Sequence, residues 1–121
     1  AGENEYTRYG FRDMINHRAV DILQPDALIL GGITEFMKVV ALAQANDLDI
    51  APHGMQEVHI HLVSAISNGL ILEYYRDSVD PMHNKIYDET LVLKNGDVYA
   101  PNRPGIGLEI NRAALTDYRV G

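Results

Sequence analysis

The feature that most constrains the fold of this chain is a repeated alternation between strand-sized apolar runs and helical patterns of apolar residues. Residues 21–24 form a strand-sized run that Pro25 closes, because the residue before a proline avoids the helical conformation. Two further strand-sized runs are predicted at residues 49–52 and 70–73. Strands that alternate with helices at this spacing are typical of parallel βαβ units, so we expect an α/β protein.

Helical patterns separate these runs. After a Gly-Gly turn at residues 31–32, Thr34 is the predicted N-cap of a helix that reaches about Asn46. The expected buried stripe of this helix has the i, i+3, i+4, i+7 spacing and comprises Phe36, Val39, Val40 and Ala43. A second stripe follows a His-Gly turn at residues 53–54 and comprises Val58, Leu62, Ala65, Ile66 and Gly69.

After about Tyr75 the pattern changes. Residues 91–93 and 98–100 are predicted to form a hairpin around an Asn-Gly turn at residues 95–96. Residues 112–118 are predicted to form a last short helix. No flexible linker is visible, so we expect this C-terminal tail to pack against another part of the protein.

Composition excludes several functional classes. Ten Lys and Arg residues against 17 Asp and Glu residues give a net charge of −7, and no basic cluster compensates locally. We therefore expect neither nucleic acid nor an anionic membrane as a partner. No run approaches the ~18 apolar residues of a membrane-spanning helix, and we expect a cytoplasmic protein. The absence of cysteine removes disulfides, thiolate metal sites and thiol nucleophiles.

An ionisable residue follows each strand end of this pattern. These residues are Glu3, Asp26, His53 and Glu73. Consecutive members are 20 to 27 residues apart, which is about one βα unit. In a parallel barrel the carboxyl ends of all strands open on one face, where active sites are built. We therefore expect these four side chains to meet at a common rim.

A rival interpretation concerns the His-Ile-His sequence at residues 59–61. On a strand, two histidines at this spacing would point the same way and would indicate a zinc hydrolase. The helical stripe through this segment instead separates the two rings by about 200°. His61 is therefore interpreted as a packing residue or as a residue that contacts the site residues without contacting the ligand.

Taken in order, these motifs resemble the enolase superfamily, in its mandelate racemase subgroup. The segments that carry the resemblance are Gly2-Glu3-Asn4, Gln24-Pro25-Asp26-Ala27 with Gly31-Gly32-Ile33-Thr34, Pro52-His53-Gly54-Met55-Gln56-Glu57 with His61, and Leu72-Glu73. The tail also resembles the C-terminus of that subgroup, through Asn95-Gly96, Pro101 and Pro104-Gly105-Ile106-Gly107. The likeness covers essentially the whole chain, in the right order and spacing.

The resemblance implies a role for each strand-end residue. Glu3 matches the third of three carboxylates that bind Mg²⁺, which is the cofactor it implies. His53 matches the general base, and Asp26 matches the carboxylate hydrogen-bonded to that base. Glu73 matches the acid that donates a hydrogen bond to the substrate carboxylate. A Lys or His base, with Mg²⁺ stabilising an ene-diolate, is the general scheme of this superfamily.

The resemblance also implies the fold. It predicts the C-terminal half of a (β/α)₈ TIM-type barrel, from the end of strand five through strand eight. Residues 1–83 would be the partial barrel that carries the active-site strand ends, and residues 84–121 a hairpin and tail associated with a capping domain. A complete barrel needs about 250 residues, so we expect a fragment that needs the missing N-terminal part of the same protein for activity.

The function implied most concretely is an acid-sugar dehydratase. His53 would abstract the α-proton of an aldonate or aldarate, Mg²⁺ would hold the enediolate, and the β-hydroxyl would leave as water. Two alternatives stay open: a racemase, epimerase or cycloisomerase that shares the first step, and a non-catalytic half-barrel module that binds a partner chain. The expected ligand is a small sugar-acid carboxylate, and we expect the whole protein to be a homo-oligomer.

Overall fold

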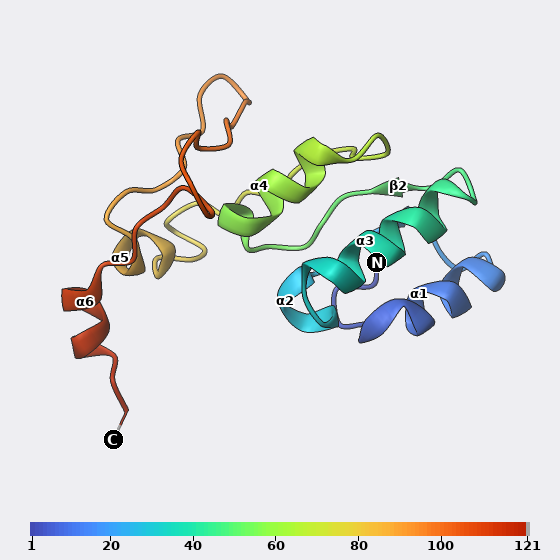
Figure 1. Ribbon diagram of the computed structural model, residues 1–121, viewed down its shortest axis with the longest axis horizontal. Helices are drawn as coiled ribbons and strands as arrows, with labels where there is room; N and C mark the ends of the chain where they lie inside the picture. The colour runs from blue at the N-terminus through green and yellow to red at the C-terminus, as the bar shows by residue number, and fades with distance from the viewer. Residues whose placement is uncertain (121) are drawn as a thin grey trace. The chain divides into compact units, whose positions relative to one another are not determined.

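The computed structural model describes residues 1–120 and contains two compact units, Ala1–Tyr74 and Tyr75–Gly121 (Figure 1). The first unit holds α1 (Thr7–Asn16), β1 (Ile22–Leu23), α2 (Ala27–Leu30), α3 (Ile33–Gln44), β2 (Asp49–Ile50) and α4 (Gln56–Ala65). The second unit holds α5 (His83–Ile86) and α6 (Arg112–Asp117). The division between units follows Tyr74, whereas the predicted boundary follows residue 83. The α/β class is as predicted.

The strands of the first unit are short and parallel. Their register pairs Ile22 with Asp49 and Leu23 with Ile50. On one side of β1, the N-terminal ammonium of Ala1 donates to the Ile22 carbonyl at 3.2 Å. On the far side of β2, Ile50 forms a single parallel bridge with Gly69. Four segments of the chain therefore lie side by side in the order of the sequence.

The prediction of a third strand at residues 70–73 is wrong. The Leu70 N–H donates to the Ile50 carbonyl at 2.8 Å, and the regular pairing stops there. In a parallel ladder every second residue of one strand bonds to the same neighbouring strand. After Ile50, the next N–H to donate to the segment that follows Gly69 would therefore be that of residue 52. Pro52 has no N–H, and the ladder ends for that reason.

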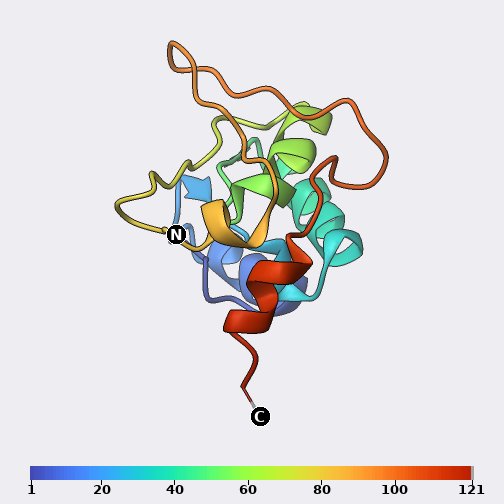
Figure 2. The same cartoon turned by 90° about the vertical axis from the view of Figure 1, so that its left-hand side faces the viewer.

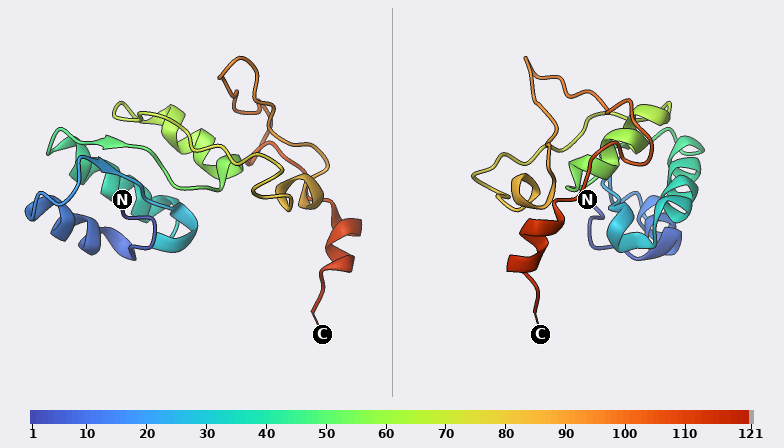
Figure 3. Two further views of the ribbon diagram at one scale, coloured as in Figure 1. Left: turned by 180° about the vertical axis from the view of Figure 1, so that it is seen from behind. Right: turned by 60° about the vertical axis from the view of Figure 1, so that its left-hand side comes forward.

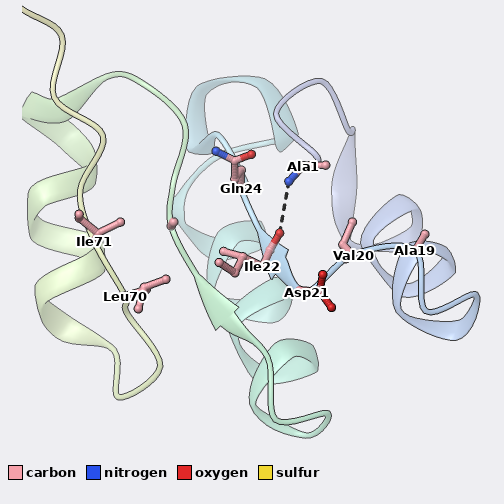
Figure 4. Close-up of a pocket in the computed structure, with 9 residues that line it drawn as sticks. Ala1, Ala19, Val20, Asp21, Ile22, Gln24, Leu70 and Ile71 are labelled. Carbon is pink, nitrogen blue, oxygen red and sulfur yellow. Dashed lines mark hydrogen bonds between the residues drawn. The ribbon is translucent and has the colours of Figure 1, made fainter.

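Helices cover one face of these strands, and α1 and α3 lie side by side (Figure 3). The core residues are Phe11, Leu23, Ala27, Leu30, Phe36, Val39, Val40, Ala43, Ile50 and Leu62. The predicted stripe of α3 is confirmed, because all four of its members are buried. On the opposite face, Ile22, Leu70 and Ile71 remain exposed and line a groove of about 450 Å³ (Figure 4).

The helix starts differ from the predictions. Gly32, with a left-handed φ of 95°, is the N-cap of α3, so Thr34 lies inside the first turn rather than before it. The short helix α2 was not predicted, since four residues carry no periodicity; Asp26 is its N-cap. Helix α1 was also missed, because its N-cap, Tyr6, provides no side-chain capping bond.

Helix α4 buries a different face from the predicted one. It ends at Ala65, so the last two members of the predicted stripe lie beyond it. Leu62 is buried as predicted, but Val58 is only half-buried. The buried residues are Gln56, Glu57, His59, Ile60 and Leu62. The polar start of this helix therefore faces the interior, next to the turn that contains His53.

The second unit consists mainly of loops. Figure 2 shows a long segment without helix or strand between α5 and α6. The two helices contact each other, and the Asn111 N–H donates to the Ile86 carbonyl at 2.9 Å. Helix α6 confirms the predicted last helix. Within residues 1–120, no helix is long and apolar enough to cross a membrane.

The predicted hairpin is reduced to its turn. Lys94 and Asp97 form an isolated antiparallel bridge, with reciprocal N–H to carbonyl distances of 2.9 and 3.0 Å. Between them, Asn95 and Gly96 both have positive φ, at 55° and 90°, as a tight two-residue hairpin turn requires. The flanking residues 91–93 and 98–100 do not continue as paired strands.

Candidate active site

Asp26 and His53 are joined by a hydrogen bond at the carboxyl ends of the two strands. Asp26 follows β1 and is only 4% exposed, and its Oδ1 accepts the N–H of Leu28 at 2.8 Å. Its Oδ2 lies 3.2 Å from Nδ1 of His53, the residue that follows Pro52. The His53 N–H also donates to the Pro25 carbonyl at 3.2 Å, so the backbone itself brings the two turns together.

This pairing determines the chemistry available to His53. An ionised carboxylate can only accept hydrogen bonds, so the Nδ1 that faces Asp26 carries the proton. In the neutral imidazole the second nitrogen, Nε2, is then the one with a lone pair. A base of this type can take a proton at neutral pH, and the buried carboxylate stabilises the imidazolium that forms.

Glu73 is tied to the same turn. Its Oε2 accepts the N–H of Gly54, the residue after His53, at 2.7 Å. The side chain is half-buried, so its other oxygen, Oε1, is the one that can meet a ligand. Because residues 70–73 do not form the predicted strand, the position of the Glu73 carboxyl group is set by its contact with the Gly54 N–H.

Glu3 lies in a tight turn, in which the Glu5 N–H donates to the Gly2 carbonyl at 3.0 Å. The buried Gly2 before it has a φ of +114°, and a Cβ there would lie 2.6 Å from the ring of Phe11. Hydrogen bonds from the backbone of Glu3 and, more weakly, of Gly2 lower the pKa of the Glu3 carboxyl, and attraction to His53 lowers it further. Its carboxylate is therefore ionised at neutral pH.

Three of the four predicted site residues thus meet around one turn, and Glu3 makes no direct contact that the described residues show there. Asp26 contacts the His53 ring and Glu73 contacts the residue after His53, whereas Glu3 is linked to His53 through charge, because His53 lowers the pKa of the Glu3 carboxyl. Among residues 1–120, no three His, Asp or Glu side chains are grouped so that they could hold a metal ion.

One residue of this arrangement was missed as a site residue. His59 lies within α4, as the helical pattern predicted, and has no exposed surface. Its Nε2 accepts the Ala27 N–H at 2.9 Å, and its Nδ1 lies 2.7 Å from the Gly54 carbonyl. The available signal was a histidine between two apolar residues, which marks a buried polar group that needs partners on both sides.

Comparison with known proteins gives this geometry a context. The family described as enolase C-terminal domain-like matches residues 1–114. The chain is 36% identical over 115 residues to an L-rhamnonate dehydratase of Saccharopolyspora erythraea, covering 91% of this chain and 30% of that protein. It is 31% identical over 122 residues to an arabinonate dehydratase of Saccharolobus solfataricus, covering 97% and 32%. The chain therefore spans about a third of the length of these relatives.

A solved structure is similar over the same range. The L-talarate dehydratase from Polaromonas sp. JS666, complexed with Mg and L-glucarate, superposes with a TM-score of 0.85 at 33% identity. The match covers 96% of this chain and 31% of that one. The resemblance seen in the strand-end motifs is confirmed by sequence and by structure alike. This chain belongs to the enolase C-terminal domain-like family.

Proposed function

We propose that the whole protein that contains this chain is a dehydratase of sugar acids, with His53 as its base. The observation that carries the proposal is the hydrogen bond between the buried Asp26 carboxylate and His53 Nδ1 at 3.2 Å, with Glu73 bound to the adjacent Gly54. The names of the relatives support the substrate class, since they include rhamnonate, arabinonate and talarate dehydratases.

We further propose that the first unit is part of a (β/α)₈ barrel, namely its C-terminal half. Four parallel segments in chain order, covered by helices on one face only, support this arrangement. The exposed apolar face with Ile22, Leu70 and Ile71 is the face that the remaining strands would cover (Figure 4). Residues 84–121 would then pack on a capping domain supplied by the rest of the protein.

The reaction follows from the positions of these groups. A proton next to a carboxylate is very weakly acidic, because its removal places a second negative charge beside the first. His53 Nε2 takes this proton, and Asp26 stabilises the resulting imidazolium. The Cα electron pair forms the Cα–Cβ double bond while the β-hydroxyl leaves as water, taking its proton from the His53 imidazolium, which returns to its neutral form. The enol product tautomerises to a 2-keto-3-deoxy acid. Glu73, when protonated, donates through Oε1 to the substrate carboxylate.

We propose Mg²⁺ as the cofactor of the whole protein and Glu3 as the ligand that this chain contributes. The chemistry of the donor supports this assignment, since an ionised carboxylate oxygen is the kind of ligand that Mg²⁺ prefers. When bound, the ion would stabilise negative charge on the substrate. The other ligands would come from outside these residues.

The test is His53→Asn in the whole protein, with His17→Asn as the matched control. His17 is exposed, and its Nδ1 lies 2.8 Å from the Asp13 carbonyl of α1, so this variant removes a histidine outside the proposed site. A panel of aldonates and aldarates, including L-rhamnonate, is incubated in D₂O, and deuterium at Cα is followed by NMR. We expect His53→Asn to lose exchange and the control to keep it.

Two results would separate the alternatives. Undiminished exchange in His53→Asn would overturn the assignment of the base. Exchange in the unaltered protein without formation of a ketone would refute the dehydratase and would favour a racemase, an epimerase or a cycloisomerase, which share the first step. Ketone formation is measured by trapping the product with semicarbazide.

A further inference from the structure

The most informative buried group outside the proposed proton transfer is His59. It lies on α4 with no exposed surface, and its ring stacks on Phe36 of α3 at 5.9 Å between ring centroids and an interplanar angle of 26°. Burial of an imidazole requires partners for both nitrogens, and His59 has both. The two partners belong to two different strand-end turns.

The partners determine the protonation state of the ring. The Gly54 carbonyl, 2.7 Å from Nδ1, can only accept a hydrogen bond, so Nδ1 carries a proton. The Ala27 N–H, 2.9 Å from Nε2, can only donate, so Nε2 carries none. His59 is therefore a neutral imidazole with its proton on Nδ1. For the same reason its Nε2, 3.7 Å from Asp26 Oδ1, makes no ion pair with that carboxylate.

These two bonds connect the residues assigned to catalysis. Ala27 follows Asp26 directly, and Gly54 follows His53 directly. Gly54 also donates its N–H to Glu73, so its peptide groups link His59 on one side and Glu73 on the other. One ring thus spans the two turns whose side chains form the 3.2 Å bond between Asp26 and His53.

Packing alone does not require this chemistry. A phenylalanine would fill a similar volume against Phe36, and its burial would not demand hydrogen-bond partners. Burial of a histidine at this position costs free energy unless both of its hydrogen bonds form. Both do form, to backbone groups of the two strand-end turns. The strands themselves are only two residues long, so they fix the relative positions of the turns weakly.

We infer that His59 is a positioning residue: as a neutral Nδ1–H imidazole, it bridges the Asp26–Ala27 and His53–Gly54 turns and fixes the distance between Asp26 and His53. The consequence for activity rests on the proposed function, whereas the bridge itself does not. His59 contacts no substrate atom in this scheme; it acts through the two turns that it joins.

The first measurement needs no substrate. The whole protein is labelled with ¹⁵N-histidine, and the ring nitrogen shifts of His59 and His53 are recorded at neutral pH. We expect His59 to be neutral with its proton on Nδ1, and the neutral form of His53 to carry its proton on Nδ1 as well. In uniformly labelled protein we expect a scalar coupling across the bond from the Ala27 amide to His59 Nε2. A charged His59, or a proton on its Nε2, would overturn the bridge.

Variants then test positioning. His59→Phe keeps the packing and removes both bonds, so we expect His53 to become a mixture of tautomers. His59→Gln carries one donor and one acceptor and should restore the Nδ1–H form. If the Phe variant does not fold, His59→Asn is used, since its shorter amide reaches only one turn and should give the same mixture. A folded Phe or Asn variant with an unchanged His53 tautomer would refute positioning.

The kinetic measurement connects the bridge to the reaction. For the sugar acid that the unaltered protein dehydrates, His59→Phe should lower kcat about 100-fold with little change in KM, because misplacement of a base by about an ångström has that effect. His17→Phe is the control and should change neither. If the unaltered protein exchanged the α-proton of no sugar acid tested, the proposed function would be refuted. The bridge would not be, because the ring nitrogen shifts test it separately.

Discussion

Replacing Asp26 with asparagine in the whole protein should abolish activity without unfolding it. Asp26 has two tasks: Oδ1 caps α2 by accepting the Leu28 N–H at 2.8 Å, and Oδ2 faces His53 Nδ1 at 3.2 Å. Asparagine keeps one oxygen, which continues to cap the helix. Its NH₂ group then faces His53 and can only donate, so His53 must accept at Nδ1 and carry its proton on Nε2.

The magnitudes of the two effects differ widely. A base with the wrong tautomer loses about 10⁴-fold in kcat in the serine-protease case, which corresponds to about 5 kcal/mol of transition-state stabilisation. Asparagine and aspartate are nearly equal as N-caps, so the free energy of unfolding should change by less than about 0.5 kcal/mol. Asp26→Ala is the matched comparison, because loss of the cap alone should cost about 1 kcal/mol.

Two assays read these effects separately. Deuterium exchange at the substrate Cα reports the proton transfer, and urea unfolding reports stability. We expect Asp26→Asn and Asp26→Ala to be similarly inactive, with only the alanine variant destabilised. An asparagine variant that keeps activity within tenfold of the unaltered protein would refute the pairing of Asp26 with His53 as the source of the base.

Two further predictions concern carboxylates with lowered pKa values. Bonds from Lys38 and from the Arg8 backbone and guanidinium lower the pKa of Glu35 from 4.5 to about 2, so its contribution to folding is complete above pH 4.5 and is lost as the pH falls toward 2. Glu35→Gln should therefore flatten the dependence of the urea midpoint on pH between 2 and 5, and an unchanged slope would contradict this. Glu3→Gln should weaken Mg²⁺ binding by the whole protein, as measured by calorimetry with MgCl₂, since an amide oxygen replaces an ionised ligand. Equal affinity of the variant would exclude Glu3 as a ligand.

The sequence was sufficient for the order of β1, α3, β2 and α4 and for the contact between Asp26 and His53. The run that Pro25 closes and the run at residues 49–52 locate β1 and β2. The parallel arrangement then places the residues after each run at one edge, which is why Asp26 and His53 are in contact. This inference needs only the period of the pattern and the handedness of βαβ units.

The parts that could not be predicted depend on local hydrogen bonds. The segment before Glu73 has the composition of a strand, yet Pro52 removes the donor that would continue its ladder. Helix α4 was expected to bury Val58 on its inner face, whereas it buries His59 together with other polar residues. An apolar pattern cannot reveal such a face, because polar residues there are stabilised by partners in distant turns.

These local bonds also explain how short strands can hold a site. The paired part of each strand is only two residues long, so the backbone ladder cannot by itself fix groups to within the fraction of an ångström that proton transfer needs. The Gly54 peptide is held from both sides, by Glu73 at its N–H and by His59 at its carbonyl. Substitutions at these contacts should therefore lower activity more than stability, while substitutions in the core beneath, such as at Phe36, should do the reverse.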